Sequence, residues 1–179
     1  MPPRRRLSCL AAALVLVVVA CGGGGGGAGG GSSSAIDGVT IEHAAGRTHR
    51  QGKISYPGKK PPTGGDHNPV PLTCGVYDQQ PPDEYAVHSL EHGAVWVAYD
   101  PSTPSGDVAT LRKLATHTKV IVSPYAGMDS PITLVAWEHR LEVARVDDPR
   151  VQQFVDTFAG ARTAPEPTAA CVGVGQPAS

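Results

Sequence analysis

Residues 94–99, Ala-Val-Trp-Val-Ala-Tyr, constrain the fold most, because they are apolar at every position. Side chains alternate between the two faces of a strand, so the valines and Tyr99 face one way while Trp96 and the alanines face the other. A strand that is apolar on both faces fits the centre of a sheet. We therefore predict a central strand here, which Asp100-Pro101 ends.

Other segments have the patterns of further strands and of two helices. Strands are predicted where β-branched or alternating apolar residues run between turn formers. These segments are 39–41, 119–123, 132–137 and 140–146, the last two as a hairpin that turns at Glu138-His139. Apolar residues at helical spacing predict a helix over 105–117. A second helix is expected after Asp148-Pro149 and up to Gly160, since aspartate is a favoured N-cap and proline a favoured first helical residue.

These elements predict an α+β domain, in which a small, mostly antiparallel sheet carries two helices on one face. A long Pro/Gly-rich loop, residues 55–83, and the turn from His88 to His92 are expected at the edge of the sheet. A globular part of this length forms one ordinary domain with a single core. The predicted organisation is a signal peptide (1–20), a tether (21–36), one globular domain (37–162) and a Pro/Ala/Gly-rich tail (163–179).

The N-terminus has the pattern of a bacterial lipoprotein signal peptide. Arg4–Arg6 form a basic start, residues 10–19 form an apolar core, and Ala20 precedes Cys21. We expect cleavage before Cys21 and attachment of acyl chains to this cysteine, which anchors the protein on the extracytoplasmic face of the cell membrane. The alternative is an uncleaved transmembrane helix, although a span needs about 20 apolar residues. Residues 22–34, almost all glycine and serine, form a flexible tether.

The charge of the mature chain argues against nucleic acid as a partner. The full chain carries 15 basic and 16 acidic residues, and removal of the leader takes away three arginines. The 12 basic and 16 acidic residues that remain give a formal net charge of −4 with neutral histidines. Nucleic-acid binding requires a basic surface, and an acidic domain is not attracted to anionic lipid either. The membrane is therefore expected as a partner through the lipid anchor alone.

Two cysteines remain in the mature domain besides the lipidated one. Cys74 and Cys171 are expected to pair as a disulfide, because compartments outside the membrane are oxidising. The link would close a loop of about 100 residues and contribute about 4–5 kcal/mol in the chain-entropy model. The alternative is a copper or zinc thiolate at Cys74, seven residues after His67.

Histidines with the spacing of metal ligands lie in the centre of the chain. His88 and His92 are four residues apart, so on a helix they share a face, and Glu91 lies beside them. Gly93 suits the left-handed residue that ends such a helix. His67 supplies a third imidazole from a loop, and three nitrogen ligands with an open position suit copper or zinc. The alternative is that these histidines only hydrogen-bond the neighbouring loop.

Four segments of the chain carry a combined motif. They are PPTGGDHNP (61–69), GVYDQQPPDE (75–84), VHSLEHGAVWVAYDP (87–101) and, more weakly, ITLVAWEHRLEV (132–143). Together they resemble the bacterial family called domain of unknown function 3105, which is common in actinobacterial membrane-anchored proteins and lipoproteins. The resemblance covers about residues 52–160 and implies a fold and an envelope location, but no established activity.

The resemblance also singles out site residues. Its matched polar positions are His67, His88, Glu91 and His92, followed by Gly93. The chain departs from the family pattern at Cys74, where a bulky residue is expected, and at Glu138-His139, where glycine and a basic residue are more usual. His139 is therefore a poor candidate for a shared site.

Three functions are compatible with these features. The first is an extracytoplasmic lipoprotein that binds copper or zinc through His67, His88 and His92, with Glu91 as an orienting acceptor or oxygen ligand. The second is an envelope module that docks a partner protein and whose histidines are structural; His43 and His49 are read as single surface histidines. The third is a metal-dependent hydrolase or oxidase with Glu91 as general base. No nucleophile elbow, CxxC pair, P-loop or dinucleotide fingerprint is present, so the sequence predicts no catalytic residues.

Overall fold

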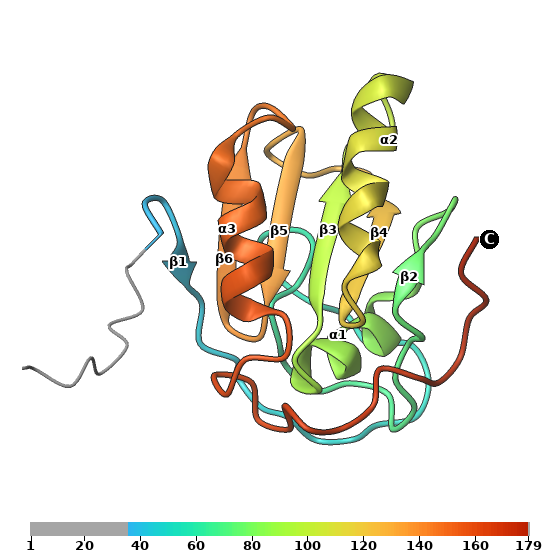
Figure 1. The fold of residues 1–179 in the computed structure, drawn as a ribbon. Helices are drawn as coiled ribbons and strands as arrows, with labels where there is room; N and C mark the ends of the chain where they lie inside the picture. Colours follow the sequence, from blue (N-terminus) through green and yellow to red (C-terminus); the bar gives the residue numbers. More distant parts are fainter. Residues whose placement is uncertain (1–35, 179) are drawn as a thin grey trace, which may run out of the picture. The chain divides into compact units, whose positions relative to one another are not determined.

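The computed structural model describes residues 36–178, and a six-stranded sheet forms the centre of this part (Figure 1). The strands are β1 (Thr40–Ile41), β2 (Gly75–Val76), β3 (Val95–Tyr99), β4 (Val120–Pro124), β5 (Ile132–Ala136) and β6 (His139–Val143). Their order across the sheet is β1-β6-β5-β3-β4-β2. β3 lies between β5 and β4 with every residue buried, which confirms the predicted central strand.

The sheet is mixed, with an antiparallel majority. β1, β6, β5 and β3 pair antiparallel in that order, whereas β3 with β4 and β4 with β2 pair parallel. Parallel neighbours need a crossover connection. Helix α2 (Ser105–Arg112) and the 3₁₀ helix η1 (Lys113–Thr116) supply it between β3 and β4. The α+β class with a mostly antiparallel sheet is therefore confirmed.

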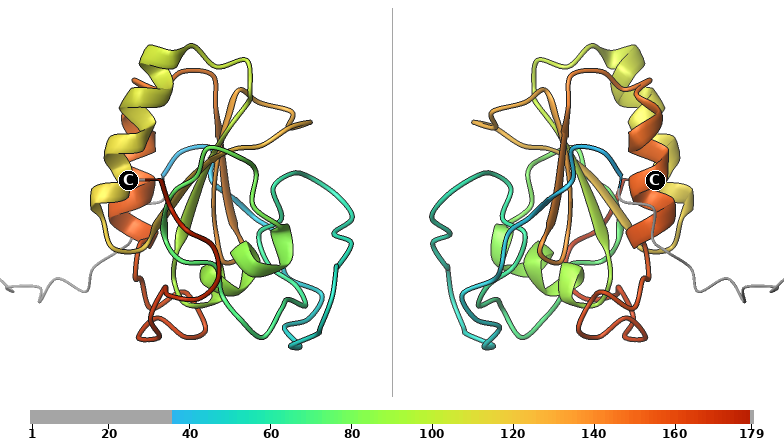
Figure 2. Two further views of the ribbon diagram at one scale, coloured as in Figure 1. Left: turned by 90° about the vertical axis from the view of Figure 1, so that its right-hand side faces the viewer. Right: turned by 90° about the vertical axis from the view of Figure 1, so that its left-hand side faces the viewer.

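Two helices cover one face of the sheet, as predicted. Helix α2 and helix α3 (Pro149–Phe158) lie on the same side in Figure 2, drawn in yellow and orange. The Asp148 side chain caps α3 by accepting a hydrogen bond from the Arg150 amide, as its place before Pro149 predicts. The core on this face consists mainly of Val95, Val97, Leu111, Val120, Val122, Leu134, Leu141, Val151, Phe154 and Val155.

A third helix, α1 (Asp83–Glu91), packs on the opposite face, where the green ribbon lies in Figure 2. Its apolar residues meet the second face of the central strands, in a cluster that includes Ala86, Val87, Leu90, Trp96, Ala98, Ile121 and Val135. The turn from His88 to His92 therefore lies over this face rather than at the edge of the sheet. The reason is that Trp96 and the alanines of β3 form a second apolar face, which is buried only when another element packs on it.

Two tight connections, the end of α1 and the β5–β6 hairpin, each contain a residue with positive φ. Gly93 ends α1 with a φ of 84°, as predicted, and a side chain there would press on the Gly160 backbone. The β5–β6 hairpin turns at Trp137-Glu138, one residue earlier than expected, because Ala136 and His139 still pair. Glu138 takes a φ of 61° in this turn, and its carboxylate accepts the Ala44 amide at 2.9 Å.

Arg140 ties the segment that precedes His67 to the sheet. Its buried guanidinium donates to both carboxylate oxygens of Glu42, at 2.7 and 3.1 Å. It also donates to the carbonyl oxygens of Lys60 and Pro61, at 3.1 and 2.6 Å. Each of the three guanidinium nitrogens therefore donates a hydrogen bond, which stabilises the charge in its buried position.

We predict that Glu42→Ala lowers the free energy of unfolding by about 2–3 kcal/mol, measured by urea denaturation. Removing one partner of a buried pair costs about 3–5 kcal/mol, and we expect less because the Glu42 side chain is 31% exposed. Glu142→Ala is the control, since it breaks a more exposed pair with Lys59 and should cost less than about 1 kcal/mol. Equal losses in the two variants would contradict the anchoring role of Arg140.

The C-terminal segment, residues 163–178, runs along the domain. The Thr73 amide donates to the Val174 carbonyl at 2.8 Å, and the Ala178 amide donates to the Val76 carbonyl at 2.7 Å. The sequence predicts only a Pro/Ala/Gly-rich tail here, since backbone hydrogen bonds of this kind do not depend on residue type.

Residues 1–35 and 179 lie outside the described part. The predicted signal peptide, the lipidated Cys21 and nearly all of the tether therefore remain predictions. Among the helices of residues 36–178, none is both long enough and apolar enough to cross a membrane.

Candidate metal centre

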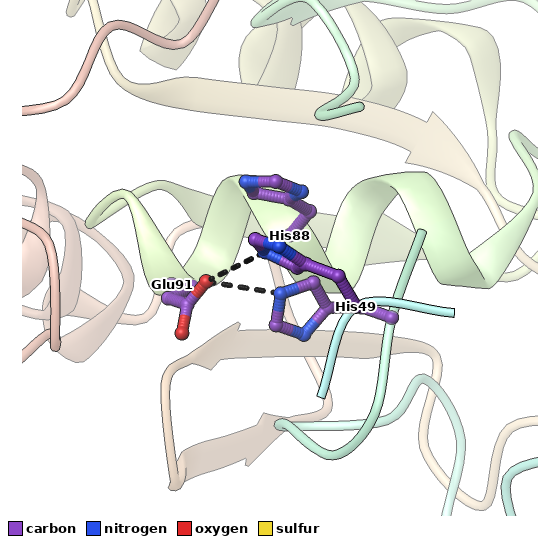
Figure 3. Close-up of side chains that lie close together, drawn as sticks. His49, His88 and Glu91 are labelled. Atoms are coloured by element: carbon purple, nitrogen blue, oxygen red, sulfur yellow. Dashed lines mark ion pairs between the residues drawn. The ribbon is translucent and has the colours of Figure 1, made fainter. Parts of the chain in front are cut away.

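Three imidazoles and one carboxylate come together beside α1. His49, His67, His88 and Glu91 each offer one ligand atom, and these four atoms all lie within 4.8 Å of one another. Figure 3 shows the rings gathered around the Glu91 carboxylate, with dashed lines for its ion pairs with two of the histidines. We call these four residues the His/Glu cluster.

Helix α1 supplies two members of the cluster. His88 and Glu91 are one helical turn apart, so they face the same side. Both side chains are almost completely buried. His92, the first residue after the helix, lies next to His88 with the two Nε2 atoms 2.9 Å apart, but it is outside the group of four.

A bridge between two loop segments supplies the other two members. The Arg50 amide donates to the His67 carbonyl at 2.8 Å, and the His67 amide donates to the Thr48 carbonyl at 3.1 Å. The Asp66 carboxylate stabilises this pairing, because it accepts hydrogen bonds from the Thr48 amide and the Arg50 guanidinium. These hydrogen bonds, led by that of Thr48, hold the pKa of Asp66 below its ordinary value. The bridge places His49 beside His67, so that its ring stacks on His88.

Backbone carbonyls fix the tautomers of three histidines. Nδ1 of His67 contacts the Gly65 oxygen at 2.8 Å, Nδ1 of His88 the Asn68 oxygen at 2.6 Å, and Nδ1 of His92 the oxygen of residue 170 at 2.7 Å. A carbonyl oxygen only accepts, so each Nδ1 carries the proton. In a neutral ring the Nε2 atom then presents a lone pair, which is the state in which imidazole binds a metal. The Nε2 atoms of His88 and His92 are 2.9 Å apart, so they too are two acceptors in contact unless a proton or a metal cation lies between them.

The Nε2 atom of His67 faces another lone pair. It lies 2.9 Å from Oε2 of Glu91, and both atoms are buried. Neither has a hydrogen-bond partner among the described residues. Two acceptors at this distance repel each other unless a proton or a metal cation lies between them. Unsatisfied buried polar atoms are rare in proteins and commonly mark an ion or a functional site.

Burial disfavours the charged form of His88. Desolvation lowers the pKa of His88 below its ordinary value, the hydrogen bond to the Asn68 carbonyl opposes this, and the neighbouring His92, His67 and His49 lower the pKa further. Its Nε2 is thus available as a ligand at neutral pH. The more open side of the cluster is formed by His49 and Arg47, whose side chains are about half exposed and lie 3.7 and 3.8 Å from the Glu91 carboxylate.

The cysteines also lie where a link is feasible. Cys74 and Cys171 are at disulfide-bonding distance, with their Cα atoms 5.4 Å apart. Cys74 is not a member of the His/Glu cluster, so the geometry favours the disulfide over the thiolate ligand.

A sequence profile described as "Protein of unknown function (DUF3105)" matches residues 48–173. The chain belongs to this family. No curated protein and no solved structure matches the chain. The matched part of this DUF3105 domain contains the whole His/Glu cluster, His92 and both cysteines.

The DUF3105 domain brings together three of the four residues that the sequence singles out, His67, His88 and Glu91. His92 is a neighbour of the cluster rather than a member of it. His49 was missed, because a histidine in a polar, exposed segment has no local sign of a partner 18 residues away. The loop pairing that unites it with His67 cannot be read from the spacing of either residue.

The donor set of this domain suits a transition-metal ion. Nitrogen and oxygen ligands lie about 2.0–2.2 Å from zinc, so two ligands of a tetrahedral ion are about 3.3–3.6 Å apart. The separations within the His/Glu cluster bracket this value, from 2.9 Å to at most 4.8 Å. Imidazole nitrogens with one carboxylate oxygen are ligands of zinc and of copper.

A cavity of about 730 Å³ lies elsewhere, at the carboxyl ends of the parallel strands β3 and β4. Tyr99, Arg112 and Pro124 are among its lining residues, and no member of the His/Glu cluster is.

Proposed function

We propose that this protein is a membrane-anchored lipoprotein of the extracytoplasmic face whose DUF3105 domain binds a transition-metal ion. The ligands are His49, His67, His88 and Glu91, and the ion is zinc or copper. The general affinity order places Cu²⁺ above Zn²⁺ for such a site.

The contact between His67 and Glu91 carries the proposal. A purely structural histidine pairs its two ring nitrogens with one donor and one acceptor. His67 instead directs its Nε2 lone pair at a buried carboxylate oxygen 2.9 Å away. A divalent cation between them would satisfy both atoms, and His49 and His88 are close enough to complete its coordination.

Calorimetric titration of the metal-free mature protein with Zn²⁺ and Cu²⁺ tests this binding. We expect His88→Ala to weaken binding by at least about 100-fold, because it removes a direct ligand. His92→Ala should weaken it by about 10–100-fold, the usual cost of losing a partner outside the ligand set. His117→Ala, which changes an exposed histidine remote in sequence from the cluster, is the control. Binding no tighter than that of a surface histidine would favour the envelope interaction module instead.

The same titration has an expected pH dependence. Protons compete with the metal for Nε2, and the lowered pKa of His88 moves this competition below the ordinary histidine value of about 6.5 at that ligand. Protonation of His88 should therefore weaken binding only below about pH 6.5, and metal affinity should fall as the medium becomes more acidic.

The anchor rests on the sequence alone. Arg4–Arg6, the apolar run and Ala20-Cys21 support lipidation of Cys21. Mass spectrometry of the membrane fraction is expected to find an acylated N-terminal cysteine, and Cys21→Ala should abolish labelling with a fatty-acid analogue. Labelling that persists in this variant would refute the lipoprotein assignment.

A further inference from the structure

The C-terminal segment from Glu166 to Cys171 borders the His/Glu cluster. The carbonyl oxygen of Ala170 accepts the proton of His92 Nδ1 at 2.7 Å. The Glu166 amide donates to the Glu91 carbonyl at 2.9 Å, and the Glu166 carboxylate lies 3.6 Å from Nε2 of His92. This segment therefore orients His92, which in turn lies against the ligand His88.

Besides the hydrogen bond of the Glu166 amide, two attachments hold this segment in place near Ala170. Cys171 follows Ala170 directly, and its link to Cys74 joins the segment to the loop before β2. The Cys74 amide also donates to the Cys171 carbonyl at 3.0 Å. The second attachment is the Lys119 ammonium, which donates to the carbonyls of Pro167 and Ala169 at 2.6 and 2.9 Å, and to that of His92 at 2.7 Å.

We propose that the Cys74–Cys171 disulfide controls the metal affinity of the His/Glu cluster, by holding the Ala170 carbonyl against His92. The inference rests on the proposed metal site. Without the link, the segment keeps the Lys119 attachment and the backbone hydrogen bonds of Glu166 and Cys171, but it loses the covalent restraint one residue from the contact with His92. His92 then loses its fixed orientation beside His88. Loss of such an orienting partner reduces metal affinity by about 10–100-fold.

The redox step is a thiol–disulfide exchange with a dithiol protein of the cell envelope. One thiolate of that protein attacks a sulfur of the Cys74–Cys171 bond, and its second thiol resolves the mixed disulfide. Two electrons and two protons pass to Cys74 and Cys171, which become thiols, while the dithiol becomes a disulfide. The site would then release its ion more readily in the reduced state.

The test measures zinc affinity by competition with a chromophoric chelator in four forms of the mature protein. These are the parent, Cys74→Ala/Cys171→Ala, His92→Ala, and the combination of all three changes. Alanine avoids the complication that free thiols bind zinc themselves. We expect the double cysteine variant to bind zinc about 10–100-fold more weakly than the parent. In the His92→Ala background, removing the cysteines should produce no further loss, because the coupling passes through His92.

NMR of the imidazole nitrogens reports the tautomer of His92, which a general loss of stability does not change. The Nδ1-protonated tautomer of His92 should be fixed in the disulfide-bonded parent and mixed in the cysteine variant. Val151→Ala, which removes buried packing of helix α3 on the opposite face of the sheet, should leave both the tautomer and the zinc affinity unchanged.

The outcomes separate the two proposals. Equal zinc affinity in the parent and the cysteine variant, or equal losses with and without His92, would overturn the coupling and leave the metal site intact. Absence of zinc binding in the disulfide-bonded parent would overturn the metal site itself.

Discussion

Replacing Glu91 by glutamine is expected to lower zinc affinity at least about 100-fold and yet to make the metal-free protein more stable. The affinity falls because a charged oxygen ligand is lost, which should cost more than the 10–100-fold of an outer partner. The stability rises because the glutamine amide has the shape of the carboxylate but can donate a hydrogen bond to Nε2 of His67. This donation replaces the contact of two buried acceptors 2.9 Å apart, and hydrogen bonds of this kind are worth about 1 kcal/mol.

A loss of zinc affinity together with a gain in the stability of the metal-free protein would identify Glu91 as a metal ligand rather than a structural carboxylate. Zinc affinity would be followed by chelator competition, and the free energy of unfolding by urea denaturation with excess chelator. Glu84→Gln is the matched control, since it makes the same change on the same helix outside the His/Glu cluster. If Glu91→Gln instead destabilised the metal-free protein, the carboxylate would be pairing with a protonated imidazole, and the cluster would be an internal ion pair.

Removing the link between Cys74 and Cys171 should lower the free energy of unfolding by about 4–5 kcal/mol. The two cysteines are 97 residues apart, so the link restricts most of the unfolded chain, and the chain-entropy model gives about 4.7 kcal/mol for a loop of 100 residues. Against a total stability of about 5–15 kcal/mol for a domain, this is a large fraction.

The measurement compares urea denaturation of the parent and of Cys74→Ala/Cys171→Ala without metal. Peptide mapping of the parent under non-reducing conditions should recover the two cysteines in one linked fragment. Thr73→Ala is the control, because it removes side-chain hydrogen bonds to the same tail without touching a cysteine. Two free thiols in the freshly purified parent, or equal midpoints of denaturation, would contradict a stabilising disulfide.

The fold was predictable where a local pattern sufficed. β3 was identified from its apolar positions on both faces, and the start of α3 from Asp148-Pro149, because burial and capping leave direct marks on residue type. The placement of α1 was not predictable in this way. Whether a short helix covers a face or lies at an edge depends on the tertiary partners of Trp96 and Leu90, which no local spacing specifies.

The residues of the candidate site likewise fall into those that a local sequence pattern predicts and those that depend on tertiary contacts. His88 and Glu91 follow from helical periodicity, and His67 from its place in the resembling motif. His49 depends on a bridge between loop segments 18 residues apart, so its contribution exists only in three dimensions. The contact of His92 with the backbone of residue 170 spans 78 residues and involves a carbonyl group, which every residue possesses.

The path of the tail along β2 affects how copies of this protein meet one another. An open strand edge invites pairing with another chain, and proteins block such edges with proline or by covering them. Here Pro177 packs on Gly75, and the Ala178 amide donates a hydrogen bond to the Val76 carbonyl. The C-terminal segment therefore covers the outer edge of β2. At the opposite edge β1 is only two residues long, which leaves little to pair with. These two blocked edges guard against aggregation by pairing of strands between copies of the protein.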